Sequence, residues 1–261
     1  MSTPSRSVET VGRGGEPPAR SERFGLSCAI VTPMAADGSV DPGRLADHAG
    51  RVLAAGCDSV TLFGTTGEGA SLGPAERSRM LGAVIGRGID PARQLYAGVA
   101  AASLADAVEQ GRHALEAGVR GLLLAPPFYF KGVDDEGLYA WFSAFIEGLG
   151  SAARGIVLYH IPSVTAVGLS VDLVGRLKRA FPGVIAGVKD SSGDWETTRA
   201  FLAHHGELAI LVGDERLLAR AVREGAQGTI CGLANLVPGW LRPVVHEGLD
   251  DPRITRLVEA V

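Results

Sequence analysis

The chain has little cysteine, little lysine and no excess of basic charge. Its 25 basic side chains are outnumbered by 29 acidic ones, which gives a formal net charge of -4. A nucleic-acid-binding domain normally carries a basic patch, so this balance argues against nucleic acid as a partner. The sequence also lacks an apolar run near the roughly 18 residues that a membrane-spanning helix needs. We therefore expect neither a nucleic-acid partner nor a membrane partner.

Cysteine occurs only at Cys28, Cys57 and Cys231. The number is odd, and no two of the three form a C-x-x-C pair. This pattern argues against a disulfide framework and against a zinc knuckle. It favours a reducing compartment, so we expect a cytoplasmic protein.

The composition also predicts the domain organisation. Apolar residues make up 46% of the 261 positions, which is enough for a sizeable core. Residues 1–23 are rich in Ser, Gly, Pro, Arg and Glu and predict a flexible N-terminal extension. We expect one folded domain at 24–238 and a C-terminal helical segment at 239–261.

Short apolar runs alternate with longer amphipathic stretches from residue 24 onwards. Eight runs are rich in Leu or β-branched residues, which is typical of buried parallel strands. They lie at 27–32, 59–63, 94–99, 121–125, 155–160, 184–189, 208–212 and 228–231. Eight strands alternating with helices predict an α/β fold of the closed (β/α)₈ TIM-barrel type. An open doubly wound sheet is the alternative, but its G-x-G-x-x-G signal does not follow the first strand.

The sixth predicted strand ends in Lys189, one of only three lysines. Alternation puts Ile185, Gly187 and Lys189 on one face. If that face is the barrel interior, Lys189 points inward, and Gly187 leaves space beside it. Burial disfavours a charged ammonium, and a neutral amine can attack a ketone to form a Schiff base. The alternative is a strand-end lysine that extends to solvent.

Two further strand ends carry reactive groups. The second strand leads into Gly64-Thr65-Thr66-Gly67, whose backbone N–H and hydroxyl groups can bind a carboxylate or phosphate. A Gly-rich turn before a helix explains the same pattern. The fifth strand ends with Tyr159, whose phenol can relay a proton if it faces the interior. An aromatic core residue is the alternative for Tyr159.

These motifs, in this order, resemble the dihydrodipicolinate synthase/N-acetylneuraminate lyase family. They are GTTGE at 64–68, Tyr-x-x-Pro at 159–162 and GVKDSSGD at 187–194. The resemblance covers about 24–238. The family consists of class I aldolases and related lyases on a (β/α)₈ barrel. The resemblance therefore implies an enzyme that forms a lysine Schiff base with pyruvate or another 2-oxo acid, without a metal or cofactor.

The resemblance also implies roles for individual residues. Lys189 matches the family's Schiff-base lysine, and Tyr159 matches the tyrosine that moves protons. Thr65 matches the hydroxyl that links two tyrosines in a relay. Thr66, with the backbone of Gly64 and Gly67, matches the cradle for the pyruvate carboxylate.

The third residue of the family's relay has two candidate positions in this sequence. Phe128, Tyr129 and Phe130 form an aromatic loop that favours a lid or a subunit contact. Tyr129 matches the family tyrosine that enters the site of a neighbouring subunit when the alignment starts from Pro127. An alignment from Glu136 places Phe130 there instead. The resemblance implies a homodimer or a homotetramer.

Departures from the family pattern bear on the second substrate. Members that make dihydrodipicolinate typically carry Arg within P-x-R-T, where this chain has Val164. Valine cannot hold a carboxylate in a bidentate pair. Asp214 and Glu215, after the seventh strand, are candidates for binding substrate hydroxyls, although a helix N-terminal acid pair explains them equally. We expect a 2-keto-3-deoxy sugar acid or a related hydroxy-oxo acid, with 4-hydroxy-tetrahydrodipicolinate synthase as the alternative.

The sequence also allows alternative interpretations of the chain end and of the function. The chain stops at Val261, earlier than family members usually do, so it is either truncated or an unusually short member. A metal-dependent barrel lyase would need a His and carboxylate cluster at strand ends, and most of the six histidines fall on helices or their edges. A non-catalytic barrel that binds a 2-oxo acid is the alternative outside enzymes.

Overall fold

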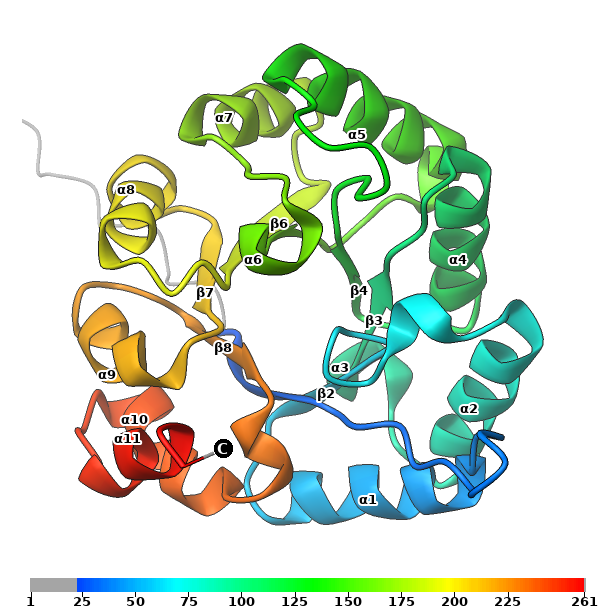
Figure 1. Cartoon of the computed structure of the whole chain (residues 1–261), viewed down its shortest axis with the longest axis vertical. Helices are drawn as coiled ribbons and strands as arrows, with labels where there is room; N and C mark the ends of the chain where they lie inside the picture. The colour runs from blue at the N-terminus through cyan, green and yellow to red at the C-terminus, as the bar shows by residue number, and fades with distance from the viewer. Residues whose placement is uncertain (1–22, 261) are drawn as a thin grey trace, which may run out of the picture.

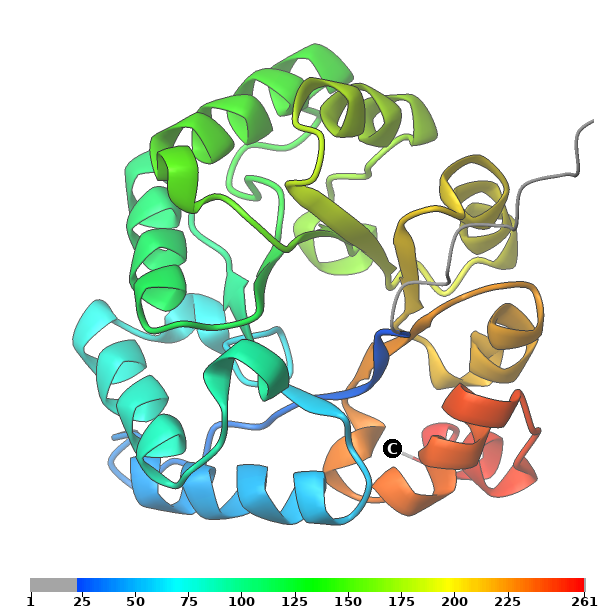
Figure 2. The same cartoon turned by 180° about the vertical axis from the view of Figure 1, so that it is seen from behind.

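The computed structural model describes residues 23–260. Eight parallel strands form a closed barrel in sequence order, which confirms the predicted (β/α)₈ fold. The helices surround the strands as an outer ring, and both views along the barrel show this arrangement (Figure 1, Figure 2). The strands are β1 (Gly25–Ala29), β2 (Ser59–Leu62), β3 (Leu95–Val99), β4 (Gly121–Leu124), β5 (Ile156–His160), β6 (Ile185–Asp190), β7 (Ala209–Val212) and β8 (Gly228–Cys231).

Helices follow the strands around the ring. They are α1 (Pro42–Ala54), α2 (Pro74–Gly86), α3 (Pro91–Gln94), α4 (Leu104–Glu116), α5 (Asp135–Leu149), α6 (Pro162–Thr165), α7 (Val171–Ala180), α8 (Trp195–His205), α9 (Glu215–Arg223), α10 (Pro238–Glu247) and α11 (Pro252–Val258). Short 3₁₀ turns lie at η1 (Gly69–Ser71), η2 (Gly150–Ala152) and η3 (Leu233–Asn235). The short α6 lies inside the ring of longer helices (Figure 1).

Side-chain oxygens cap the N-termini of most of the helices. A serine or aspartate at each of these N-caps accepts a hydrogen bond from a backbone N–H of the first turn, which satisfies a donor that the helix leaves unpaired. These caps are Asp41, Ser103, Asp134, Ser170, Asp194, Asp214 and Asp251. The loops before these helices therefore end at defined positions.

Two apolar layers fill the molecule. Residues on the inner strand faces, such as Leu123, Val157 and Leu211, form one buried cluster inside the barrel. Residues of the opposite parity, such as Leu122 and Leu158, pack with the helices in a larger outer cluster. This separation follows from the two-residue period of a strand.

The barrel closes through two glycines. Gly25 of β1 pairs with Gly228 of β8, and a Cβ added at Gly228 would lie 2.1 Å from the carbonyl oxygen of Gly25. Pairing with β8 makes β1 begin two residues earlier than the sequence predicted. It also ends earlier, at Ala29.

The strand that carries Lys189 departs from simple alternation. Ile156 pairs with Ile185, whereas Val157 pairs with Gly187, so Ala186 is an extra residue in β6. This irregularity turns Ile185 into the outer cluster, and its predicted inward position was wrong. A Cβ at Gly187 would lie 2.4 Å from the carbonyl oxygen of Ala209. Gly187 therefore permits close approach of β6 and β7 and does not leave the open space that we expected.

The ends of the described chain pack on the barrel. Residues 1–22 of the predicted extension lie outside the described residues. Arg23, the last residue of the predicted extension, donates a 2.6 Å hydrogen bond to the carbonyl of Val245. Helix α10 packs against β1 and α9, and α11 also packs against α9. None of the helices within 23–260 combines the length and apolar character that crossing a membrane requires.

Candidate active site

Lys189 and Tyr159 meet inside the barrel. They are in register on the neighbouring strands β6 and β5, and each side chain is buried with about 5% exposure. The Lys189 Nζ lies 3.1 Å from the Tyr159 hydroxyl and 4.3 Å from the centre of its ring. The predicted inward direction of Lys189 is therefore correct, and the solvent-extending alternative does not hold.

Two hydroxyl side chains join this pair. The Thr65 Oγ1 lies 3.4 Å from the Tyr159 hydroxyl, so the structure brings Thr65, Tyr159 and Lys189 together. Ser191 also hydrogen-bonds to Tyr159, although the sequence analysis did not single it out. Ser191 lies two residues after Lys189, and extending the strand alternation by one step would have found it. A Cβ on Gly213 would fall 2.0 Å from the Ser191 hydroxyl, so Gly213 leaves room for this serine.

The phenol of Tyr159 is more acidic than an ordinary tyrosine. Burial by itself raises the pKa of Tyr159, because it disfavours the phenolate. The Lys189 ammonium and the hydrogen bonds from Thr65, Lys189 and Ser191 act in the opposite direction and outweigh burial. The net result is a pKa below the usual value, which suits a group that gives and takes a proton.

The loop after β2 holds Thr65 through a strained residue. Phe63 is buried and has φ 59°, a left-handed conformation that a bulky side chain rarely adopts. Its carbonyl fills the space where a Cβ would stand on Gly69 or Gly98. These two glycines therefore allow the backbone turn that places Thr65.

Arg77 holds the same loop from helix α2. Its buried guanidinium donates hydrogen bonds to the carbonyls of Gly69 (3.1 Å) and Gly98 (2.5 Å) and stacks over the Phe63 ring at 4.2 Å. Burial lowers the pKa of Arg77 to about 10. Sequence reasoning missed this residue, because an arginine on an amphipathic helix is usually solvent-facing.

Internal contacts hold the rest of the Gly-rich loop in place and leave two of its backbone N–H groups without a partner in the described chain. The Gly67 carbonyl accepts a 2.6 Å hydrogen bond from Thr32, and a Cβ on Gly67 would meet the Ile30 carbonyl oxygen at 2.5 Å. The Gly64 carbonyl accepts from the N–H of Gly69 at 3.0 Å. Within 23–260, the backbone N–H groups of Thr65 and Thr66 donate to no residue.

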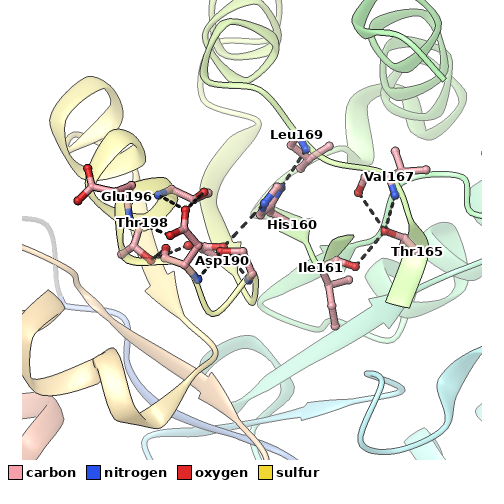
Figure 3. A network of polar contacts seen from close by, with 11 residues as sticks. His160, Ile161, Thr165, Val167, Leu169, Asp190, Glu196 and Thr198 are labelled. Atoms are coloured by element: carbon pink, nitrogen blue, oxygen red, sulfur yellow. Dashed lines mark hydrogen bonds and ion pairs between the residues drawn. The ribbon is translucent and has the colours of Figure 1, made fainter. Parts of the chain in front are cut away.

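A buried polar network lies on the opposite face of β5 and β6 from Tyr159 and Lys189 (Figure 3). The Asp190 carboxylate accepts hydrogen bonds from the Thr198 hydroxyl (2.6 Å) and the Ser192 N–H (2.9 Å). The His160 Nδ1 accepts from the N–H of Leu169 at 2.9 Å, and its Nε2 lies 4.0 Å from Asp190. Burial lowers the pKa of His160, against the opposing effect of Asp190. His160 is thus a packed, neutral residue, and the pair fixes the ends of β5 and β6.

A cavity of about 290 Å³ opens beside Tyr159. It lies at the C-terminal ends of β2 to β5, where barrel enzymes place their chemistry. Thr65 and Tyr159 stand on its wall, so the hydroxyl that contacts the Lys189 amine also faces this cavity. Apart from the carboxylate of Glu68, the described lining has no charged group.

The aromatic loop lies at the rim and away from Lys189. Tyr129 and Phe130 are 70% and 77% exposed, and their rings contact each other edge to face at 5.2 Å. Lys131 donates to the carbonyls of Phe128 and Thr165, which ties this loop to α6. Within one chain, Tyr129 is not brought to the Lys189 pair.

Asp214 and Glu215 line a separate cavity with Ser191 and Gly213. Asp214 caps α9 and forms a 2.6 Å ion pair with Arg216, whose hydrogen bond lowers the pKa of this carboxyl. The Glu215 carboxylate accepts from the N–H of Leu233 at 3.1 Å. Both carboxylates thus have partners within the protein. Among the described residues, no group of three or more His, Cys, Asp or Glu side chains is arranged to hold a metal ion.

Comparison with known proteins places this barrel in a family. A sequence model of the dihydrodipicolinate synthetase family matches residues 23–251. The chain is 37% identical over 234 residues to an uncharacterized DapA-like lyase of Chloroflexus aurantiacus, covering 88% of this chain and 77% of the relative. It is 34% identical over 230 residues to 4-hydroxy-tetrahydrodipicolinate synthase of Thioalkalivibrio sulfidiphilus, covering 88% and 76%.

The structural comparison agrees with the sequence match. A crystal structure of dihydrodipicolinate synthase from Agrobacterium tumefaciens str. C58 superimposes with a TM-score of 0.89 at 55% identity. The match covers 91% of this chain and 83% of that one. The resemblance inferred from the three motifs is therefore confirmed. The chain belongs to the dihydrodipicolinate synthetase family of lyases and aldolases.

Proposed function

We propose that the protein is a class I lyase that forms a Schiff base between Lys189 and pyruvate or another 2-oxo acid. The contact between Lys189 and Tyr159 carries this proposal. A buried amine 3.1 Å from a phenol has both the nucleophile and the proton carrier that imine formation needs. Thr65 at 3.4 Å from the same phenol supports a relay of protons to the cavity.

The chemistry follows from this arrangement. The Lys189 amine adds to the ketone carbon of a 4-hydroxy-2-oxo acid, and loss of water leaves a protonated imine. Tyr159 takes the proton of the 4-hydroxyl, the C3–C4 bond breaks, and its electron pair moves into the imine to give an enamine. An aldehyde leaves, the enamine carbon is reprotonated, and water releases pyruvate. Aldol condensation is the reverse sequence, and dehydration uses the same imine.

The Gly-rich loop is the proposed cradle for the substrate carboxylate. The backbone N–H groups of Thr65 and Thr66 have no partner within 23–260, which supports donation to an anion. The Thr66 hydroxyl and the backbone of Gly64 and Gly67 complete this loop. A carboxylate held here would keep the neighbouring ketone within reach of Lys189.

For the second substrate we favour a hydroxy-oxo acid over aspartate semialdehyde. Val164 lines the cavity where an arginine would be needed to pair with a second carboxylate. This class includes the 2-keto-3-deoxy sugar acids as its polar members and 4-hydroxy-2-oxo acids with apolar C4 substituents. The internal partners of Asp214 and Glu215 do not favour them as binders of sugar hydroxyls, so this proposal assigns them no substrate contact.

Synthesis of 4-hydroxy-tetrahydrodipicolinate is the second candidate. Relatives with that activity in their names, at 34% and 55% identity, favour it. Condensation of pyruvate with aspartate semialdehyde would test it directly. Turnover faster than with any hydroxy-oxo acid would replace the first candidate.

The assembly and location are part of the same proposal. Exposure of Tyr129 and Phe130 at the rim supports a contact with another copy of the chain, in a homodimer or homotetramer. In that assembly Tyr129 would act on the site of the neighbouring subunit. We propose a cytoplasmic location, on the grounds of the unpaired cysteines.

Exchange of the pyruvate methyl protons in D₂O tests the mechanism without the second substrate. Enamine formation replaces these protons with deuterium, which proton NMR follows. We expect exchange with the wild type, loss in Lys189→Ala and strong slowing in Tyr159→Phe. A strong chelator is expected to leave the rate unchanged. Binding of pyruvate without exchange would favour a non-catalytic barrel, and sensitivity to the chelator would favour a metal-dependent lyase.

A further inference from the structure

We propose that the cavity beside Tyr159 takes an apolar group, so that the substrate is a 4-hydroxy-2-oxo acid with an aromatic or branched aliphatic substituent at C4. The aldehyde released by cleavage, or accepted in condensation, is then apolar as well. This inference rests on the proposed function and specifies its substrate class.

The walls of the cavity are the main support. Carbon side chains line it on several sides, from the ends of β3, β4 and β5 and from the neighbouring loops. They are Val99, Leu123, Ala125, Phe128, Ile161 and Val164. A ligand that fills such a space removes apolar surface from water on both partners, and each buried methylene stabilises the complex.

Apart from Thr65 and Tyr159, to which the proposed chemistry gives a role, the polar side chains at this cavity are already hydrogen-bonded or stand at its rim. The Thr165 hydroxyl lies 3.0 Å from the carbonyl oxygens of Ile161 and Val167 and accepts from the Val167 N–H at 3.2 Å (Figure 3). The exposed Glu68 and Ser71 belong to the surface loop around η1. A polyhydroxylated chain would therefore lose water here without gaining matching partners.

The charges at the cavity also oppose a second carboxylate. Glu68 is the single charged residue of the described lining, and it would repel another anion. Lys131 lies nearby, but its ammonium already donates to the carbonyls of Phe128 and Thr165. Val164, which is 59% exposed, offers no positive charge at the entrance.

The size of the cavity fits such a group. An apolar protein cavity of about 150 Å³ is large enough to hold benzene. The space beside Tyr159 is about 290 Å³, which leaves room for a phenyl ring and part of the oxo-acid chain. The C4 substituent would then lie against Leu123 and Ile161, with the 4-hydroxyl facing Tyr159.

Cleavage of a matched substrate set tests the inference. Two members have apolar C4 substituents: 4-hydroxy-2-oxo-4-phenylbutanoate and 4-hydroxy-5-methyl-2-oxohexanoate. The others are 2-keto-3-deoxygluconate and 4-hydroxy-2-oxoheptanedioate, which end in hydroxyls or a carboxylate. Lactate dehydrogenase and NADH report pyruvate release. We expect kcat/KM to be at least about tenfold higher for the apolar pair. Equal or faster cleavage of either polar substrate would overturn the inference.

Substitution at Val164 provides a second test, which should shift the substrate preference from apolar toward anionic substrates. Val164→Arg is expected to lower kcat/KM about tenfold for the apolar substrates and to raise it for the heptanedioate. Val164→Asn, a smaller change, should lower the apolar activity without helping the heptanedioate. Leu249→Arg is the matched control, because it also replaces an exposed apolar residue but lies outside the cavity lining. Identical substrate preferences in Val164→Arg and Leu249→Arg would contradict the inference.

Methyl-proton exchange of pyruvate, measured on the same preparations, separates the two proposals. Exchange by the wild type without a preference for apolar substrates would overturn the substrate class alone. Absence of exchange in the folded wild type would overturn the Schiff-base function, and the substrate class with it.

Discussion

At the scale of the residue, the site depends on what surrounds one phenol. Tyr159 contacts the amine of Lys189, the proposed nucleophile, and the hydroxyls of Thr65 and Ser191. Burial makes its ionisation harder, whereas the nearby ammonium makes it easier. The balance can be changed by removing one charge while leaving the barrel intact.

Titration of Tyr159 should therefore respond to Lys189. In Lys189→Met the ammonium is lost but burial remains, so the pKa of Tyr159 should rise and the phenolate should appear at higher pH. Ultraviolet absorbance of the phenolate measures this titration. The chain has four tyrosines, so the titration of a matching variant that also carries Tyr159→Phe is subtracted to isolate Tyr159. Lys178→Met removes a lysine that pairs with Glu207 on the outer ring and should not move the titration. An unchanged titration in Lys189→Met would contradict the assigned electrostatics.

At the scale of the element, a helix and a loop cooperate to place Thr65. Phe63 adopts a left-handed conformation that costs on the order of 1–3 kcal/mol. Arg77 of α2 offsets this cost by bonding the carbonyls of Gly69 and Gly98 and stacking on the Phe63 ring. The loop that carries Thr65 is thus held by a residue outside the cluster of Lys189, Tyr159 and Thr65.

Removing the Arg77 charge should weaken both stability and exchange. Arg77→Met leaves two buried carbonyls without a charged donor, so we expect a loss of roughly 2–4 kcal/mol in the free energy of unfolding. Pyruvate methyl exchange should fall at least about tenfold, because Thr65 is no longer fixed. Arg79→Met, on the exposed face of α2, is the control for urea unfolding and exchange. Equal behaviour of the two variants would show that Arg77 does not position the loop.

The strands and the residues on them show which features of the fold and the site could be predicted from the sequence. The strands and the inward direction of Lys189 follow from local apolar runs and alternation, which depend on neighbouring residues only. The extra residue in β6, which turns Ile185 outward, depends on pairing with β5 and has no local signal. The same applies to Arg77, whose burial is set by glycines on another strand and loop.

At the scale of the whole molecule, closure of the barrel brings distant strand ends to one site. β1 and β8 meet where Gly25 and Gly228 pair, and the two backbones approach too closely for a side chain. Gly228 also has φ 154°, which favours glycine. A change at this position therefore acts on the whole ring of strands.

Closure gives a stability prediction with an internal control. Gly228→Ala places a Cβ 2.1 Å from the Gly25 carbonyl oxygen, so we expect a loss of about 3 kcal/mol in the free energy of unfolding. Gly82→Ala changes an exposed glycine inside α2 with nothing within 4 Å of the new Cβ, and should gain about 0.5–1 kcal/mol. Urea unfolding measures both. A neutral Gly228→Ala would argue against tight closure at this seam.

Trapping of the imine tests the central claim most directly. Intact-mass analysis after borohydride reduction with pyruvate is made on the wild type and on Lys189→Ala, which keeps Lys131 and Lys178 as internal controls. We predict a mass increase equal to pyruvic acid less one oxygen on the wild type and none on the variant. No adduct on a folded wild type, or the same adduct on Lys189→Ala, would contradict the assignment of Lys189 as the Schiff-base lysine.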